Sequence, residues 1–505
     1  MIKLIYRIES DYMSKKRMLI VTSVTLSVVT ISLGIVKLYQ TYALSNYIGT
    51  VTDTGIDVYI NDDSYASIPA NGSSNVYYML TNTNPGTVKY GVAYQTTSGV
   101  TVKVYDTSED PATGTIEEND KKYIKLHLEN KNSTNKTIEL STVLGYENGG
   151  DLVVPSGVTL VTDTYTPPPT AAEYITKLYT TASKTTVTNN SITYNTAPSV
   201  SLMNDRLGGT TTDLDGGNIR YYGASPNNYI YFNCSDYSNQ TSSTCETWRI
   251  IGVFDGKLKL IRGSQIGTYS WDNKDTSTGV ESNFGKNDWT TARLMKLLNP
   301  SDYYTTDSND NNLGQGLYYN SASGKCYSGQ NNATVDCNFT STGIKNDITR
   351  NMIAETTYNL GGWNSNTVYP NLMYEKERGT TVYTGRPTTP WTGKIALAYT
   401  SDYGYAADLN QCKDKTLYDY NNSTCTSNNW MKAIITNNGS NSGWLLTPYC
   451  STSSNVWYVY PVGNVYFNYT VYSAFGAVPV LSLSSELGIE SGGDGSSSNP
   501  YKLSA

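Results

Sequence analysis

Length and charge limit the classes of protein to which this chain can belong. It has 505 residues, of which 16% are charged, and its formal net charge is −7. This length suggests two to four domains. The charge balance argues against nucleic-acid binding, because the chain offers no basic stripe that could neutralise phosphates. Tyrosine outnumbers phenylalanine by 45 to 6, so most aromatic rings tolerate water at one end.

An apolar run near the N-terminus predicts a membrane anchor. Residues 18–36 contain no charged side chain, and Lys15, Lys16 and Arg17 precede them. A run of this length is typical of a transmembrane helix, with a long signal-peptide core as the alternative. The positive charge before it predicts that residues 1–17 are cytoplasmic and that the rest of the chain is extracellular.

Residues 46–165 are predicted to form an all-β, immunoglobulin-like sandwich that serves as a stalk. About seven short segments of this range alternate between apolar and polar residues, as half-buried strands do. His127 lies between two leucines in one of them and is expected to face solvent. The expected strands cover residues 56–60, 76–80, 88–92, 100–104, 123–128, 138–144 and 158–161.

A proline-rich stretch separates the stalk from a second domain. Residues 166–170 are predicted to be a stiff linker, and a capping box that starts at Thr170 begins a helix. The predicted head, residues 171–503, mixes strand-like segments with two further helices, one near Asp288 and one over residues 344–358. This mixture predicts an α+β domain.

The cysteines indicate an oxidising compartment. Six of the seven form near-neighbour pairs separated by polar sequence, and Cys450 is left over. Loops of this length suit local disulfides, each worth roughly 3 kcal/mol in the chain-entropy model. Metal binding is the alternative, but the chain has no Cys-x-x-Cys motif and its only histidine lies in the other domain. The predicted disulfides are Cys234–Cys245, Cys326–Cys337 and Cys412–Cys425.

The segment from residue 449 to residue 472 is rich in tyrosine and carries no charged side chain. Tyrosine combined with serine, glycine and asparagine is the composition of binding loops. We therefore predict a ligand-binding surface, with ordinary sheet-facing rings as the alternative. The predicted ligand-binding residues are Tyr449, Trp457, Tyr458, Tyr460, Tyr466, Tyr469 and Tyr472.

The two interpretations of this segment differ in what alanine variants should do. If the rings are exposed anchors of a binding surface, Trp457→Ala or Tyr460→Ala should weaken ligand binding by about 2 kcal/mol or more and leave folding intact. A core role predicts instead a loss of roughly 3–5 kcal/mol of stability.

Several motifs of the second domain resemble those of uncharacterised bacterial surface domains. They are Glu246 to Val253, Asn287 to Thr290 and the closing Gly476 to Leu481. These domains are similar to the formylglycine-generating enzyme, a relative of the C-type lectin fold. The resemblance covers roughly residues 170 to 503 and implies a lectin-type head. It departs from the family pattern at Val478, where members often carry arginine.

The resemblance also has functional implications. The same fold is used by target proteins of diversity-generating retroelements, whose C-terminal segment is varied to rebuild a ligand surface, and residues 449–472 look like such a segment. Oxidase activity does not carry over, because only Cys450 stands where the enzyme needs a copper-binding cysteine pair. Fold-level analogy of this kind does not establish function.

Enzymatic activity is not expected, and neither is a metal or cofactor. A catalytic triad would need a histidine in the head, which has none. Glu375 and Glu377 belong to the densest charged cluster of the head, and paired carboxylates can hydrolyse glycosides. A solvated face with local ion pairs is the more ordinary interpretation. Residues 213–218 resemble a cation loop, but their glycine spacing does not fit the EF-hand pattern.

The sequence thus predicts a membrane-anchored, extracellular protein whose lectin-type head binds a protein or glycan ligand. The alternatives are a surface hydrolase that uses Glu375 or Glu377, and a structural component of the envelope.

Overall fold

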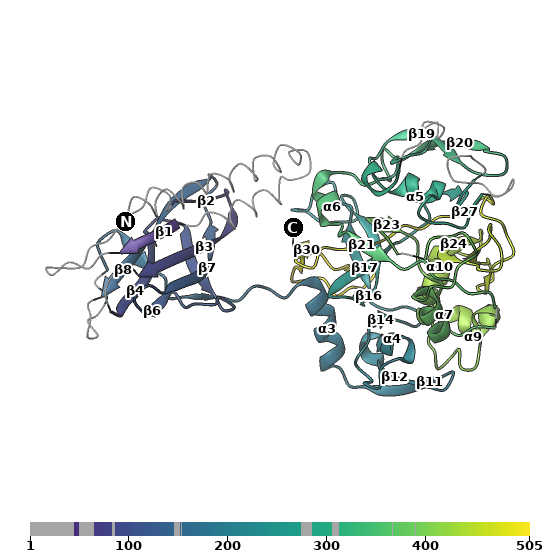
Figure 1. The fold of residues 1–505 in the computed structure, drawn as a ribbon, viewed down its shortest axis with the longest axis horizontal. Helices are drawn as coiled ribbons and strands as arrows, with labels where there is room; N and C mark the ends of the chain where they lie inside the picture. Colours follow the sequence, from purple (N-terminus) through teal and green to yellow (C-terminus); the bar gives the residue numbers. More distant parts are fainter. Residues whose placement is uncertain are drawn as a thin grey trace. The chain divides into compact units, whose positions relative to one another are not determined.

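A computed structural model of the chain describes residues 45–49, 65–82, 86–145, 152, 154–273, 285–305, 313–365, 367–388 and 390–504. The chain divides into two compact units, Met1–Pro168 (unit 1) and Pro169–Ala505 (unit 2), which carry the purple-to-blue and the teal-to-yellow elements of Figure 1.

The fold class predicted from the sequence is wrong. The described chain is mostly β-sheet with few helices, whereas the prediction combined a transmembrane helix with an α+β head. The longest described helix, α3 (Ala171–Thr181), has 11 residues. No helix among the described residues is both long and apolar enough to cross a bilayer, and residues 18–36 lie outside the described part of the chain.

The helices of unit 2 are short because residues that favour strands interrupt them. The helix predicted over residues 344–358 is limited to α6 (Asp347–Met352). The chain then forms β21 (Thr356–Tyr358), which pairs with β22 (Trp391–Gly393). Threonine and tyrosine fit a pleated sheet better than a helix, so pairing with β22 overrides the helical pattern. The other predicted helix is reduced to α5 (Arg293–Leu298).

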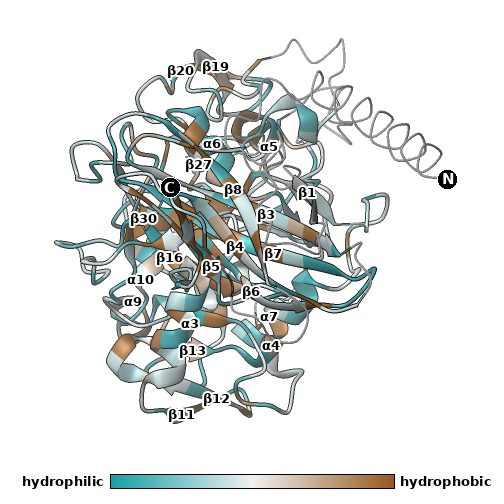
Figure 2. Cartoon of the chain, turned by 90° about the vertical axis from the view of Figure 1, so that its left-hand side faces the viewer, coloured by the Kyte–Doolittle hydropathy of each residue, from teal (hydrophilic) through white to brown (hydrophobic). Residues whose placement is uncertain are grey.

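The described residues of unit 1 form two five-stranded sheets that share one apolar core. The first sheet has the order β1-β3-β7-β5-β10, and the second has the order β2-β8-β4-β6 with β9 also paired to β4. Apolar and polar positions alternate along β3 and β7, as Figure 2 shows. The strands are β1 (Ser45–Gly49), β2 (Tyr65–Ile68), β3 (Gly72–Asn82), β4 (Val88–Gln95), β5 (Val100–Tyr105), β6 (Thr113–Ile116), β7 (Lys121–Asn130), β8 (Lys136–Gly145), β9 (Val158–Leu160) and β10 (Thr164–Tyr165).

His127 on β7 is buried, contrary to the expectation that it faces solvent. Its side chain stacks on the ring of Tyr165 with a centroid distance of 3.6 Å, and its Nδ1 lies 2.7 Å from Oδ1 of Asn75. Strand β10 pairs with β5 and places Tyr165 over this face. Burial lowers the pKa of His127. The alternation along β7 predicted the face correctly but could not show that β10 covers it. The predicted strand over residues 56–60 lies outside the described residues.

Unit 2 contains a nine-stranded sheet and a five-stranded sheet. The nine-stranded sheet has the order β11-β12-β13-β14-β16-β17-β28-β23, with β15 also paired to β16. Its strands are β11 (Thr185–Asn189), β12 (Ile192–Ala197), β13 (Leu202–Asn204), β14 (Ile219–Tyr221), β15 (Tyr229–Phe232), β16 (Glu246–Phe254), β17 (Lys257–Arg262), β23 (Ile395–Ala396) and β28 (Val480–Ser482).

The five-stranded sheet of unit 2 has the order β18-β27-β24-β25-β26 and carries the C-terminal part of the chain, drawn in light green and yellow in Figure 1. Its strands are β18 (Thr268–Tyr269), β24 (Gly443–Pro448), β25 (Val456–Val459), β26 (Val465–Tyr466) and β27 (Phe475–Gly476). Two short hairpin-like pairs and several short helices complete the unit: β19 (Ser323–Tyr327) with β20 (Thr334–Asn338), β29 (Gly488–Ile489) with β30 (Leu503–Ser504), α4 (Arg206–Gly209), α7 (Pro370–Glu377), α8 (Thr400–Tyr405), α9 (Ser423–Ser427) and α10 (Trp430–Ile435).

The three predicted cysteine pairs lie at disulfide distance, which confirms the expected disulfide bonds. They are Cys234–Cys245, Cys326–Cys337 and Cys412–Cys425, all within unit 2. The second pair links the adjacent strands β19 and β20. Cys450 is free and half-buried, and burial raises the pKa of its thiol to about 11.

Peptide mapping of the full chain without reductant should recover these three linked pairs. Iodoacetamide should label Cys450 slowly in the folded protein and rapidly after denaturation, because a protonated, half-buried thiol is a poor nucleophile. Closing each of these short loops should stabilise the folded chain by roughly 3 kcal/mol. A disulfide that includes Cys450 would contradict this pairing.

Candidate functional site

Two of the predicted ligand-binding residues belong to the core. Trp457 and Tyr458 lie on β25, between β24 and β26, and each has an exposed fraction of 0%. Successive side chains of a strand point to opposite faces, and both faces of β25 are covered. Trp457 belongs to one apolar cluster of unit 2 and Tyr458 to a different one. Neither ring can therefore act as an exposed anchor, and this part of the predicted binding surface is corrected.

The other five predicted residues reach the surface. Tyr460 is 42% exposed and Tyr469 is 45% exposed, while Tyr449, Tyr466 and Tyr472 are half-buried. Tyr460 follows β25 at the turn that leads into β26, where the chain is no longer covered on both faces. The exposed rings of the segment thus lie at the ends of strands and in turns, and its buried rings lie inside a strand.

Four rings contact one another in a row, which we call the aromatic ladder: Tyr449, Phe467, Tyr466 and Tyr418, the last of which is tilted by 37° to its neighbour. The rings of Tyr449 and Phe467 are 4.1 Å apart and 7° from parallel. The rings of Phe467 and Tyr466 are 5.5 Å apart and 9° from parallel. Tyr418 contacts Tyr466 at 5.5 Å and is itself 37% exposed. The ladder therefore joins two segments of the chain in one surface feature.

Tyr418 was missed in the sequence because it lies outside the aromatic segment. It belongs to a short 3-10 helix (Leu417–Asn421) inside the loop that the Cys412–Cys425 disulfide closes. The sequence showed only a tyrosine in a polar loop closed by a predicted disulfide. This pattern does not indicate which part of the domain the loop contacts. The docking partner is β26, which this short helix contacts.

The loop that follows β24 is held by two polar side chains. The amide nitrogen of Asn287 lies within 2.9 Å of the backbone oxygens of Tyr449, Thr452 and Asn455. Arg386 donates from Nε to Oδ1 of Asn287 at 3.0 Å and from Nη2 to the oxygen of Ser453. These bonds fix the backbone beside the ladder, so little conformational entropy remains to be lost when a ligand binds.

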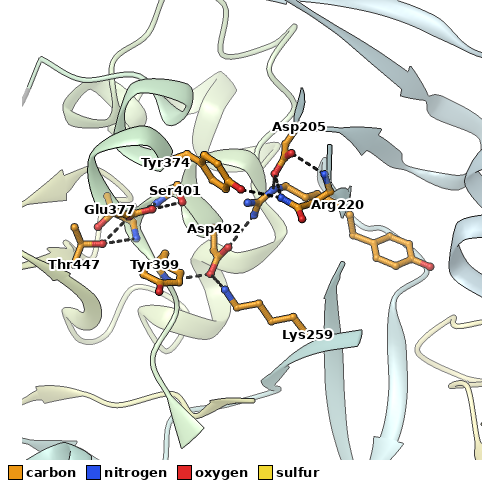
Figure 3. Close-up of polar contacts among 12 residues, drawn as sticks. Asp205, Arg220, Lys259, Tyr374, Glu377, Tyr399, Ser401, Asp402 and Thr447 are labelled. Carbon is orange, nitrogen blue, oxygen red and sulfur yellow. Dashed lines mark hydrogen bonds and ion pairs between the residues drawn. The ribbon is translucent and has the colours of Figure 1, made fainter. Parts of the chain in front are cut away.

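A cluster of four buried charges connects the nine-stranded sheet to α8, as Figure 3 shows. Arg220 donates to Asp205 at 2.5 Å and to Asp402 at 2.8 Å. Lys259 also donates to Asp402. The four side chains, which we call the charge cluster, are at most 5% exposed, and their formal charges cancel.

The two cations control the ionisation of Asp402. Burial alone raises the pKa of this carboxyl, but Lys259 and Arg220 more than offset that effect and lower it to about 2. The backbone N–H of Tyr399 also donates to Asp402 at 3.0 Å. Asp402 is therefore ionised at every ordinary pH, and its role is to neutralise two buried cations.

Glu377 forms a neighbouring polar group that supports β24. Its carboxylate accepts from the N–H of Ser401 at 3.0 Å, from the hydroxyl of Ser401 and from the hydroxyl of Thr447 at 2.7 Å. Figure 3 shows these contacts at the left of the cluster. Burial raises the pKa of Glu377. Thr447 stands on β24, two residues before Tyr449, so these bonds hold the strand from which the aromatic segment begins.

The structure separates the two carboxylates that were considered for hydrolysis. Glu377 is 0% exposed and its oxygens are occupied by Ser401 and Thr447. Glu375 is exposed and pairs with Lys376 at 3.2 Å. The two carboxylates therefore do not face one surface that a substrate can reach. Glu377 is not part of a solvated face, although the local ion pairs expected in this cluster are present, since Glu377 also pairs with Arg378 at 3.7 Å.

Sequence reasoning missed the charge cluster because its members come from four separate segments. Arg220 stands between Ile219 and Tyr221 in a short apolar strand, which was the one local sign of a buried charge. Lys259 alternates with leucines on β17, but nothing nearby in the sequence indicates that its partner is Asp402 on α8.

No metal site is evident in the part of the chain that the structure covers. There, no three His, Cys, Asp or Glu side chains are grouped so that they could hold an ion. The glycine-rich stretch at residues 213–218 is a turn in which Asp213 accepts from the backbone N–H of Asp215 at 2.9 Å.

Comparison with known proteins adds no assignment. No protein family, curated protein or solved structure matches this chain. The resemblance to lectin-type surface domains thus rests on its motifs alone.

Proposed function

We propose that unit 2 binds a protein ligand through an aromatic face, which consists of the aromatic ladder together with Tyr460 and Tyr469. The observation that carries this proposal is the ladder itself, in which rings from two chain segments contact one another and are partly exposed. Tyrosine supplies a large contact area and a hydroxyl group at low cost in conformational entropy. Aromatic anchors of this kind are enriched at protein interfaces.

The way in which the rings stack favours a protein over a glycan. Phe467 is nearly parallel to both Tyr449 and Tyr466 and contacts both, so these neighbours reduce the area of ring face that the ladder leaves open. The ladder consequently offers ring edges and tyrosine hydroxyl groups, while sugars stack on open ring faces. Edges and hydroxyl groups suit the mixed apolar and polar surface of a protein.

The disulfides support a location outside the cytoplasm. Disulfide bonds persist in oxidising environments and are rare in the cytosol. One of the three, Cys412–Cys425, closes the loop that carries Tyr418. Oxidation therefore also helps to position one end of the ladder.

The proposal is tested by selecting binders to the full chain from a phage-displayed random peptide library, with a glycan array probed in parallel. Selected peptides should lose about 2 kcal/mol of binding free energy, roughly 30-fold in Kd, on Tyr418→Ala or Tyr469→Ala. Tyr65→Ala is the matched control, since this tyrosine is 52% exposed but lies in unit 1. Peptides that bind the parent and both aromatic-face variants equally would contradict the proposal, as would binding on the glycan array alone.

A further inference from the structure

A hollow of about 470 Å³ lies where β16 begins and β17 ends. Its lining includes two arginines, Arg249 and Arg262, and one acidic residue, Glu246. The formal charge of the lining is therefore +1. Thr247 and Ser264, which also line the hollow, are exposed and add two hydroxyl groups.

Arg262 and Glu246 satisfy each other. Nε of Arg262 donates to Oε2 of Glu246 at 3.0 Å, and Nη2 donates to Oε1 at 3.3 Å. Nη1 of Arg262 donates to the backbone and side chain of Ser264. A guanidinium and a carboxylate that are joined by two hydrogen bonds neutralise each other, so this pair offers no net charge to a ligand. The surplus positive charge of the hollow thus belongs to Arg249.

Arg249 is buried without a carboxylate. It is 7% exposed, and it forms no ion pair with any acidic side chain among the residues that the structure covers. Its Nε donates to Asn228, and its Nη2 donates to the backbone oxygen of Pro226 at 3.3 Å. An arginine has five N–H donors, so the three that remain, two of them on Nη1, have no acceptor in the described chain.

Two aromatic rings contact the guanidinium group of Arg249, and the Nη1 edge of this group, which we call its open edge, has no hydrogen-bond acceptor among the described residues. The guanidinium carbon lies 3.6 Å from the ring centre of Tyr229 and 4.9 Å from that of Trp430. These cation–π contacts stabilise the cation but accept none of its in-plane N–H bonds. Burial lowers the pKa of Arg249 to about 10, as expected where no anion offsets the loss of solvent. Buried charges in proteins are normally paired.

We propose that the hollow is a binding site for an oxyanion, such as a phosphate, sulfate or carboxylate group, which accepts hydrogen bonds from the open edge of Arg249. The Nη1 donors lie in the plane of a guanidinium, the geometry that matches two oxygens of an oxyanion. Thr247 and Ser264 can donate from the rim. This site is independent of the aromatic face, and neither proposal depends on the other.

The test uses the full chain with inorganic phosphate, inorganic sulfate and sodium acetate as separate probes, each against sodium chloride at the same ionic strength. Thermal melts and calorimetric titration should show saturable binding of at least one oxyanion and a rise in Tm beyond the chloride control. The probe with the lowest half-saturating concentration identifies the group that the site prefers.

Two variants make the result specific to the hollow. Arg249→Lys keeps a cation but loses the planar set of guanidinium N–H donors, so the Kd for the oxyanion should rise roughly tenfold or more. Thr247→Glu places a carboxylate on the rim, where it should occupy the site and abolish binding while the fold stays intact. Thr186→Glu is the matched control, because Thr186 is an exposed strand residue of unit 2 outside the hollow.

The proposal is overturned if the parent responds to all three oxyanions only as it does to chloride. It is also overturned if Thr247→Glu binds as tightly as the parent and Thr186→Glu. Thr247 is exposed, so Thr247→Glu should fold like the parent. It therefore tests the site even if Arg249→Lys lowers the stability of the protein.

Discussion

Replacing Trp457 with alanine is expected to lower the free energy of unfolding by about 3–5 kcal/mol. The side chain is 0% exposed and packs in edge contacts against both Tyr449 and Phe467, with ring-centroid distances of 6.1 Å and 5.1 Å. Its Nε1 donates to the backbone oxygen of Trp363 at 3.3 Å. Truncation would leave a cavity beside the ladder and would remove one of the two donors to this carbonyl, which also accepts from the N–H of Cys450 at 3.3 Å.

Urea denaturation of Trp457→Ala beside Tyr460→Ala checks this expectation. Tyr460 is 42% exposed, so its truncation should change the free energy of unfolding by no more than about 0.5 kcal/mol. The two aromatic residues stand three positions apart and were predicted from the sequence to behave alike. Equal stability of both variants would contradict the burial of Trp457.

Replacing Asp402 with asparagine is expected to cost about 3–5 kcal/mol at pH 7. The amide would leave Arg220 and Lys259 with one buried carboxylate, Asp205, in place of two. An uncompensated buried cation is expensive, because neither water nor a counterion can reach it. Asp336→Asn is the matched control, since its ion pair with Lys325 is exposed and should contribute about 1 kcal/mol or less.

The effect of Asp402 should also depend on pH with a definite sign. The folded-state pKa is lowered from 3.8 to about 2, so the carboxylate stabilises the folded chain above pH 3.8, and this stabilisation is lost as the pH falls through about 2. The shift corresponds to about 2 kcal/mol. The stability difference between the parent and Asp402→Asn should therefore narrow by about this amount between pH 5 and pH 2 in urea titrations. A difference that stays constant over this range would show that Asp402 is not held by the two cations.

The aromatic segment illustrates how far local sequence can be used to predict a site. Its composition indicated many rings and no charges, and five of the seven selected residues do reach the surface. The pattern could not separate Trp457 and Tyr458 from Tyr460, because burial of a strand depends on the elements that cover its two faces. The contact of Tyr418 with Tyr466 could not be predicted for the same reason, since it results from the docking of a distant loop.

Features that depend on short separations along the chain could be predicted from the sequence. The three disulfide pairs span 11 to 13 residues, and the capping box at Thr170 involves residues three apart, so both could be predicted from spacing. The β-rich architecture of unit 2, the burial of Glu377 and the lack of a carboxylate partner for Arg249 result from contacts between remote segments. Each of these depends on which remote segment lies opposite: β22 beside β21, Thr447 beside Glu377, and rings in place of a carboxylate around Arg249. Strand pairing and charge compensation are long-range interactions, and a local pattern contains no information about their partners.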